Sequence, residues 1–314
     1  MNSNSIVKPH RLPKGGTIGI ASPAKWMAED RLKIAAKVLI DAGYRVKFGS
    51  ACHLRENQYA GSTEERIREL ENLFADPEID AIICARGGYG SIRVTDRLDY
   101  LIIRENPKIF VGFSDVTALH CAFQQECGLT TFHGPMLWNF EESTDPFTLS
   151  NLLYVMSGDD PAELEFPKDL PPIVLREGTA SAPLFGGNLT LLTKMIGTRW
   201  DFDTEGTILF VEDVDEKYYR TDRDLLHLKR AGKLDGIAAL VVGQMTNIED
   251  EEIPFGKSVD EIVMDICGDG DYPIVSNFPC GHGRHLATLP LGIPTRLAAV
   301  DSNVSFKLLE LAVS

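Results

Sequence analysis

Long hydrophobic runs are missing from this 314-residue chain, although 44% of its residues are hydrophobic. No apolar stretch reaches the roughly 18–20 residues that a membrane-spanning helix needs. The N-terminal segment MNSNSIVKPHRLPKGG also lacks the apolar core of a signal peptide. The sequence therefore predicts no association with membranes and a cytoplasmic location.

Metal-binding and disulfide patterns are missing as well. The chain has six cysteines, but none of them forms a C-x-x-C pair, and no H-E-x-x-H motif is present. In a chain of this length without a signal peptide, the cysteines are most simply free, buried thiols. We expect neither a metal ion nor an organic cofactor.

Positive charge is scarce. The chain has 31 Lys and Arg residues against 46 Asp and Glu residues, which gives a formal net charge of −15. An acidic surface without a basic cluster repels phosphate backbones, so nucleic acid is not expected as a partner. A small anionic substrate is compatible with this charge, because a few local arginines act at short range.

The first half of the chain alternates short apolar runs with amphipathic segments. The apolar runs at 17–22 and 109–112 are each followed by a segment with helical periodicity. Another such segment precedes the apolar run at 81–85: it starts with a capping box over 62–65, and its apolar face consists of Ile67, Leu70, Leu73 and Phe74. This alternation predicts an α/β domain with a doubly wound parallel sheet over 1–150. Pro- and Asp-rich sequence from about Asp145 to Pro172 is typical of a linker, which is predicted over 151–172. Strand and helix signals resume in a second, mixed α/β domain over 173–314.

Ser114 is the first candidate for chemistry, because it follows the apolar run at 109–112 and opens a helix. A serine on such a turn projects its hydroxyl from the sheet edge, and the amide of Asp115 can stabilise an oxyanion. The stretch is not the G-x-S-x-G elbow, since Val116 stands in place of the second glycine. The alternative is that Ser114 merely caps the helix.

The stretch Arg86-Gly-Gly-Tyr-Gly90 follows another apolar run and brings three glycines together. Glycines let the backbone approach a ligand closely. The pattern is neither the dinucleotide fingerprint nor a phosphate-binding loop. It is suited to donating backbone amides to an oxyanion, and its alternative reading is a tight strand-to-helix turn.

Two further candidates lie in the second half. Glu212 ends an apolar strand, and His282 lies in a glycine-flanked loop after another strand. A histidine can remove the serine proton while a carboxylate orients the imidazole. Glu216 and His285 lie four and three residues further on, so the sequence leaves open which member of each pair is used.

These motifs also resemble those of a known family, the LD-carboxypeptidases, whose relatives include the microcin-C self-immunity proteins. The matching stretches occur in order along nearly the whole chain: TIGIASPA near 20, ARGGYG at 85–90, VGFSD at 111–115, FHGP at 132–135, GGNLTLL at 186–192, LFVED at 209–213, YRTDR at 219–223 and GHGRHLATLPLG at 281–292.

The resemblance implies a catalytic triad of Ser114, Glu212 and His282, with an oxyanion hole formed by the amides of Gly88 and Asp115. It also implies a flavodoxin-like N-terminal domain, a smaller swivelling β/α C-terminal domain, an active site between them and a homodimer. A serine carboxypeptidase that releases D-alanine from a muropeptide tetrapeptide, in peptidoglycan recycling, is then the expected function.

Two alternatives remain open on the sequence. One is an immunity amidase that cleaves an acyl-sulfamoyl or phosphoramidate adenylate conjugate, with Trp138 or Trp200 stacking on the base. The other is a non-catalytic two-domain binding protein. For a substrate carboxylate, the forked guanidiniums of Arg86 and Arg220 are the expected binding residues.

Overall fold

The computed structural model describes residues 6–158, 160–161 and 163–314, so parts of the N-terminal segment and of the predicted linker lie outside the described residues. The chain forms two compact units. The N-terminal unit comprises Met1–Asp160, Thr288–Pro290 and Leu311–Ser314, and the C-terminal unit comprises Pro161–Ala287 and Leu291–Glu310. The change from one unit to the other therefore falls within the 151–172 segment.

The N-terminal unit is built on a six-stranded sheet in the order β11-β5-β4-β3-β1-β2. Strands β1 to β5 are parallel, and β11 is antiparallel to β5. The strands are β1 Thr17–Ala21, β2 Arg45–Phe48, β3 Ala81–Cys84, β4 Ile109–Gly112, β5 Phe132–His133 and β11 Leu289–Pro290. The order of the parallel strands is that of flavodoxin-like folds, which confirms the predicted fold class.

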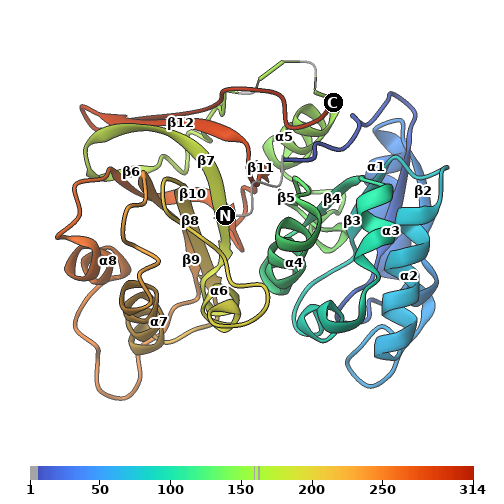
Figure 1. The fold of residues 1–314 in the computed structure, drawn as a ribbon, viewed down its shortest axis with the longest axis horizontal. Helices are drawn as coiled ribbons and strands as arrows, with labels where there is room; N and C mark the ends of the chain where they lie inside the picture. The colour runs from blue at the N-terminus through green and yellow to red at the C-terminus, as the bar shows by residue number, and fades with distance from the viewer. Residues whose placement is uncertain (1–5, 159, 162) are drawn as a thin grey trace. The chain divides into compact units, whose positions relative to one another are not determined.

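Helices pack around this sheet, which explains why β1, β3 and β4 are buried along their whole length (Figure 1). They are α1 Glu29–Asp41, α2 Thr63–Ala75, α3 Tyr100–Glu105, α4 Thr117–Cys127 and α5 Pro146–Ser157. Helix α2 begins with a capping box in which Ser62 and Glu65 exchange hydrogen bonds. Both its start and its buried apolar face agree with the pattern read from the sequence.

Helix α5 is a difference from the sequence-based expectation. Asp145 caps it by accepting a hydrogen bond from the amide of Thr148, and Pro146 occupies its first turn. Pro and Asp at these positions start a helix but also characterise loops, so composition alone favoured a loop here. Leu152, Val155 and Met156 bury the inner face.

The C-terminal unit contains a seven-stranded mixed sheet in the order β13-β12-β7-β8-β9-β10-β6. Strands β7 to β10 run parallel, whereas β6, β12 and β13 pair antiparallel with their neighbours. The strands are β6 Ile173–Arg176, β7 Gly178–Asn188, β8 Ile208–Val214, β9 Ala239–Thr246, β10 Ile274–Gly281, β12 Pro294–Val300 and β13 Asn303–Leu308.

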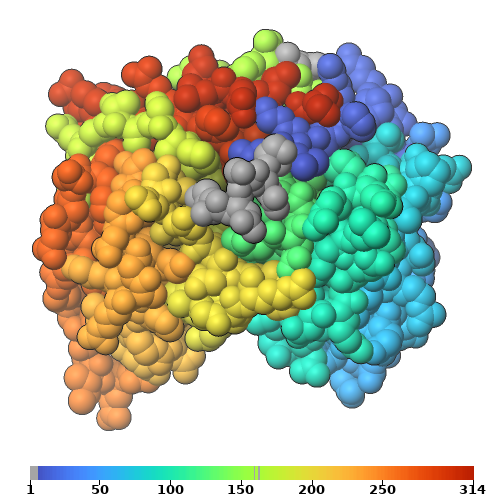
Figure 2. Space-filling model, in the orientation of Figure 1, coloured from blue at the N-terminus to red at the C-terminus, as the bar shows by residue number. Residues whose placement is uncertain are grey.

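In the described part of this unit, the helices that accompany the sheet are α6 Leu189–Met195, α7 Tyr218–Arg230 and α8 Val259–Cys267. The sheet curls where β7 and β12 arch over its other strands (Figure 1). The loop between β9 and α8, in orange at the lower left of Figure 2, projects from the unit and exposes 83% of Ile253. The sequence predicted the second α/β domain but missed β6, β7 and β12.

The sequence predicted free, buried cysteines and no membrane-spanning helix, and the structure bears on both expectations. All six cysteines are free and buried, as expected. In the described part of the chain, no helix is long and apolar enough to cross a membrane.

Strand β7 packs against β8 at a place that only glycine can occupy. Gly186 has a φ of 152°, and a Cβ atom added to it would lie 2.0 Å from the carbonyl oxygen of Phe210. Because that neighbour is backbone of a central strand, it cannot move without disturbing the sheet.

We therefore expect Gly186→Ala to lower the free energy of unfolding by about 3 kcal/mol or more. Gly197→Ala is the matched control, since Gly197 also has a positive φ but no atom within 4 Å of an added Cβ. It should cost only the left-handed backbone penalty, about 1–2 kcal/mol. Urea unfolding followed by circular dichroism measures both, and equal losses would contradict the role of the strand contact.

Candidate active site

Ser114 lies just beyond the carboxyl end of β4, where a short 3₁₀ turn, Ser114–Val116, leads into α4. Its φ is 60°, a left-handed conformation that non-glycine residues seldom adopt. A Cβ atom on Gly112 would lie 2.7 Å from Cγ1 of Val116, so the turn also requires a glycine. Strained backbone of this kind clusters at functional sites.

The buried carboxylate of Asp115 ties this turn to the glycine-rich loop 86–91. It accepts hydrogen bonds from the amides of Ser91 at 2.8 Å and Gly90 at 3.3 Å. Burial raises the pKa of Asp115, and these hydrogen bonds oppose the shift. A Cβ atom on Gly87 would lie 3.5 Å from the Asp115 amide nitrogen, so the loop lies directly against the residue that follows Ser114.

A buried arginine holds the same loop from another direction. Arg66 of α2 donates hydrogen bonds from Nη1 to the carbonyl oxygens of Pro23 at 2.6 Å and Gly90 at 3.0 Å. The loop after β1 is thereby joined to loop 86–91. Arg66 was not predicted as a functional residue; its one signal in the sequence is that a charged residue stands on the apolar face of α2.

Glu69, one turn further along α2, anchors the loops after β1 and β2. It accepts hydrogen bonds from the amides of Ser22, Ala51 and Cys52 at 2.6–3.1 Å. Burial raises the pKa of Glu69 to about 7, against the opposing effect of these hydrogen bonds. Helix α2 therefore fixes the backbone beside loop 86–91 with one buried cation and one buried acid.

In the C-terminal unit, the structure brings together Glu212 and His282. Glu212 belongs to β8, is fully buried, and lies 2.8 Å through Oε2 from Nδ1 of His282. His282 follows β10 directly, and the carboxyl ends of both strands meet at one sheet edge. A Cβ atom on Gly281 would lie 2.8 Å from Oε2 of Glu212, so glycine leaves room for this contact.

The charge state of His282 reflects this contact. Burial alone lowers the pKa of the imidazole, but the hydrogen bond and charge of Glu212, with the charges of Asp213 and Asp215, outweigh it. The net result is a pKa above the usual value of 6.5. Glu212 therefore stabilises the imidazolium that a proton transfer to His282 would form.

Glu216 and His285, which the sequence left as alternatives to Glu212 and His282, have other partners. Glu216 accepts from Nη1 of Arg220 at 3.3 Å. His285 lies 3.0 Å through Nε2 from Oδ1 of Asp169. Ser114, in contrast, lies in the N-terminal unit.

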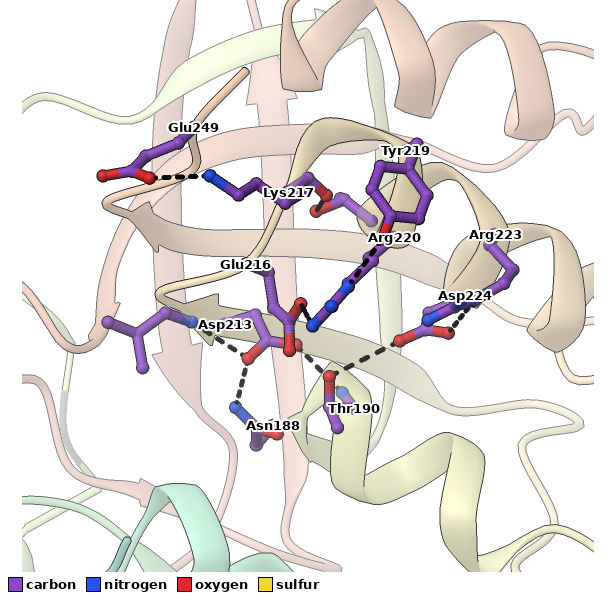
Figure 3. A network of polar contacts seen from close by, with 12 residues as sticks. Asn188, Thr190, Asp213, Glu216, Lys217, Tyr219, Arg220, Arg223, Asp224 and Glu249 are labelled. Atoms are coloured by element: carbon purple, nitrogen blue, oxygen red, sulfur yellow. Dashed lines mark hydrogen bonds and ion pairs between the residues drawn. The ribbon is translucent and has the colours of Figure 1, made fainter. Parts of the chain in front are cut away.

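A polar network holds the end of β8 around Asp213, the residue that follows Glu212 (Figure 3). Asp213 accepts hydrogen bonds from the side-chain amide of Asn188 at 2.8 Å and from the backbone amide of Thr190 at 3.0 Å. Burial, followed by the neighbouring charge of Glu212, raises the pKa of Asp213 to about 6. The network fixes the turn between β7 and α6 to the end of β8.

Among the described residues, no group of three or more His, Cys, Asp or Glu could hold a metal ion.

The two arginines predicted to bind substrate have different surroundings. Arg86 is half-buried, and its guanidinium lies 4.2 Å from the ring centre of Trp138, which is 43% exposed. Arg220 is exposed and contacts Glu216 and the hydroxyl of Tyr219 (Figure 3). Burial lowers the pKa of Arg86. Trp200, the other aromatic candidate, is only 6% exposed.

Family models identify the chain. Residues 18–134 match the LD-carboxypeptidase N-terminal domain, and residues 181–297 match the LD-carboxypeptidase C-terminal domain. The chain belongs to the LD-carboxypeptidase family. It is therefore an enzyme of the serine-type carboxypeptidase class, a hydrolase, rather than a binding module without catalysis.

Individual LD-carboxypeptidase relatives cover nearly the whole chain. A probable murein peptide carboxypeptidase of Bacillus subtilis is 35% identical over 98% of this chain and 95% of its own length. A murein tetrapeptide carboxypeptidase of Pseudomonas aeruginosa is 29% identical over 93% of this chain and 95% of its own.

Solved structures have the same fold. The muramoyltetrapeptide carboxypeptidase from Oxalobacter formigenes superposes with a TM-score of 0.82 at 30% identity, over 93% of this chain and 98% of that one. The microcin C7 self immunity protein superposes with a TM-score of 0.90 at 23% identity, over 98% of this chain and 100% of that one. At that identity the second likeness shows the fold alone.

The contact between Glu212 and His282 predicts the titration of this LD-carboxypeptidase. Because Glu212 raises the pKa of His282, Glu212→Gln should lower it while burial of the ring persists. Glu216→Gln is the matched control and should leave His282 unchanged, since Glu216 contacts Arg220 instead. NMR titration of the histidine ring protons measures the midpoint, and an unchanged midpoint in Glu212→Gln would contradict the assignment.

Proposed function

We propose that this enzyme hydrolyses the amide between the L-centre of a diamino acid and a terminal D-alanine in a muropeptide tetrapeptide, with Ser114 as nucleophile. The observation that carries the triad is the 2.8 Å hydrogen bond between buried Glu212 and His282. The substrate class is supported by the names of the Bacillus and Pseudomonas relatives, which are murein peptide carboxypeptidases.

In the proposed reaction, neutral His282 takes the proton of Ser114 as its oxygen attacks the carbonyl of the diamino acid. The backbone amides of Gly88 and Asp115 then stabilise the oxyanion, and Glu212 stabilises the imidazolium. His282 returns the proton to the leaving amine, D-alanine departs, and an acyl-enzyme remains. Water, activated by His282, releases the product and regenerates Ser114.

Arg86 and Arg220 are the proposed contacts for substrate carboxylates. Among the described residues, the guanidinium of Arg86 has no hydrogen-bonding or ionic partner, although burial has removed part of its hydration. A half-buried cation without a counterion favours an anionic ligand. Arg220 uses Nε and Nη1 for Tyr219 and Glu216, which leaves Nη2 for a second carboxylate.

A second candidate function is cleavage of a nucleotide-peptide conjugate, as in the microcin immunity proteins. The exposed indole of Trp138 favours it, because an adenine ring could stack there. Trp200 is buried and cannot serve. Arg86 already covers Trp138 at 4.2 Å, which weakens this candidate against the muropeptide.

A cytoplasmic location and a homodimer complete the proposal. Six free, buried thiols are typical of a reducing compartment. Peptidoglycan recycling supplies its substrates inside the cell, and the homodimer is carried over from the family resemblance.

Product analysis tests the proposed bond. Incubation with a tetrapeptide should yield tripeptide and D-alanine, detected by mass spectrometry, at the same rate with and without EDTA, because the proposed steps use side chains and water only. A nucleotide-peptide conjugate assayed in parallel should be cleaved more slowly. Faster cleavage of the conjugate, loss of activity with chelator, or hydrolysis at another bond would refute the scheme.

Substitutions test the triad. Ser114→Ala and His282→Ala should each lower kcat on the order of 10³-fold or more, and Glu212→Gln by the same factor or less, with KM little changed. The double Ser114→Ala/His282→Ala variant should be scarcely worse than either single variant, since the residues act as a unit.

Two matched controls accompany these variants. Glu216→Gln and His285→Gln should keep most of the activity, because their partners are Arg220 and Asp169. Circular dichroism of every variant separates unfolding from catalytic loss. If Glu216→Gln abolished turnover while Glu212→Gln did not, the assigned carboxylate would be wrong.

A further inference from the structure

Lys25 lies against the loop that carries the proposed oxyanion amide. It follows β1 in the segment Ser22-Pro-Ala-Lys25, and its side chain crosses Gly88. A Cβ atom on Gly88 would lie 2.6 Å from Cδ and 2.9 Å from Cε of Lys25. The ammonium group is one bond beyond Cε, so its charge lies beside Gly88.

Among the described residues, neither Lys25 nor Arg86 has a counterion. Within the ranges that the structure describes, neither side chain makes a hydrogen bond or ion pair, and both are half-buried. Several other lysines of this acidic chain have carboxylate partners, as Lys37 has in Asp41 and Lys217 in Glu249. Lys25 lies across Gly88, and Arg86 precedes Gly88 by two residues on the same loop.

The backbone that carries these cations is fixed. Arg66 bonds the carbonyl oxygens of Pro23 and Gly90, which joins the two loops. The amide of Trp138 donates to the carbonyl oxygen of Ala85, and the amide of Ser22 donates to Glu69. A preorganised pair of cations binds an anion without first ordering its own loops.

We propose that Lys25 and Arg86 together form the subsite for the free C-terminal carboxylate of the substrate, and so make the enzyme an exopeptidase. This inference rests on the proposed function. In a terminal amide the carboxylate carbon is three bonds from the scissile carbonyl carbon, or about 4 Å. The terminal carboxylate must therefore lie close to the oxyanion amide, and Lys25 and Arg86 are cations against and on the loop that carries this amide.

The assignment gives Lys25 a role in substrate selection. A peptide bound across an internal peptide bond has no free carboxylate next to the scissile amide. Both cations would then stay unpaired and partly desolvated in the complex. Such a loss discriminates strongly, because a site built for a charged group rejects a ligand that lacks it. Lysine has a compact ammonium group, whereas arginine has a planar guanidinium with several N–H donors. One carboxylate has enough lone pairs to accept hydrogen bonds from both groups.

The test compares a tetrapeptide acid with its C-terminal carboxamide. Wild-type enzyme should prefer the acid by about tenfold to a hundredfold in kcat/KM, the range for a charged hydrogen bond. Lys25→Met, which keeps the apolar stem, should lower kcat/KM for the acid about tenfold, mainly through KM, and leave the carboxamide unchanged. Lys25→Arg should restore part of the preference, and Lys25→Met/Arg86→Met should abolish it.

Lys37→Met is the matched control, since Lys37 is exposed and forms an ion pair with Asp41 of the same helix. It should leave both substrates unchanged. If Lys25→Met lowered turnover of acid and carboxamide equally, Lys25 would hold the loop rather than the carboxylate. If it changed neither, Lys25 would not touch the substrate. Either result overturns the proposal.

A binding measurement separates this inference from the proposed function. In NMR titrations, N-acetyl-D-alanine should bind wild-type enzyme more tightly than its amide does, and Lys25→Met/Arg86→Met should remove the difference. If the tetrapeptide is not cleaved but this binding difference is found, the proposed function fails and the subsite survives. If the tetrapeptide is cleaved without it, only the subsite fails. Absence of both turnover and binding overturns both.

Discussion

The arrangement of the N-terminal unit depends on one buried carboxylate, that of Asp115. An acid removed from water must find hydrogen-bond donors, and the amides of Gly90 and Ser91 are those available. Loop 86–91 is thereby fixed to the residue after Ser114. Because Arg66 holds the other side of that loop and also the segment after β1, two loops that are far apart in sequence keep one geometry at the carboxyl edge of the sheet.

The C-terminal unit uses a comparable arrangement at the edge of its own sheet. Glu212 is buried beside glycines of two strands, since added Cβ atoms on Gly243 and Gly281 would lie 3.0 Å and 2.8 Å from its atoms. Because glycine has no side chain, these two positions leave space for the carboxylate of Glu212 and the imidazole of His282. Asp213, facing the other way from the same strand, binds the next turn of the chain. Parallel strands thus supply both the hydrogen-bonded pair of Glu212 and His282 and the network that supports it.

Local patterns predicted the parts of the structure that depend on near neighbours. The apolar runs of β1, β3 and β4, the capping box of α2 and the strand-to-helix turn at Ser114 are all readable from short stretches. Helix α5 was missed because its Asp-Pro start has the composition of a loop. Strand β7 was missed because its glycines and alanines show no clear alternation of apolar and polar residues.

Long-range partners could not be read from the sequence. Glu212 and Glu216 are equivalent as residue types, and only the 2.8 Å contact with His282 distinguishes them. Arg66 lies 24 residues from Gly90 along the chain, and Lys25 is 63 residues before Gly88, so no motif joins either pair. Family resemblance supplied the triad as an expectation, and it carried no information about these supporting contacts.

The cations Lys25 and Arg86 belong to a chain of net charge −15, and this contrast has a kinetic consequence. At low ionic strength an approaching anion meets the repulsion of the whole protein before it reaches Lys25 and Arg86. Dissolved salt screens that field beyond about 10 Å at 0.1 M, whereas a contact inside the site is screened much less. Capture of an anionic peptide should therefore become faster as salt is added, the reverse of the usual behaviour of electrostatically steered enzymes.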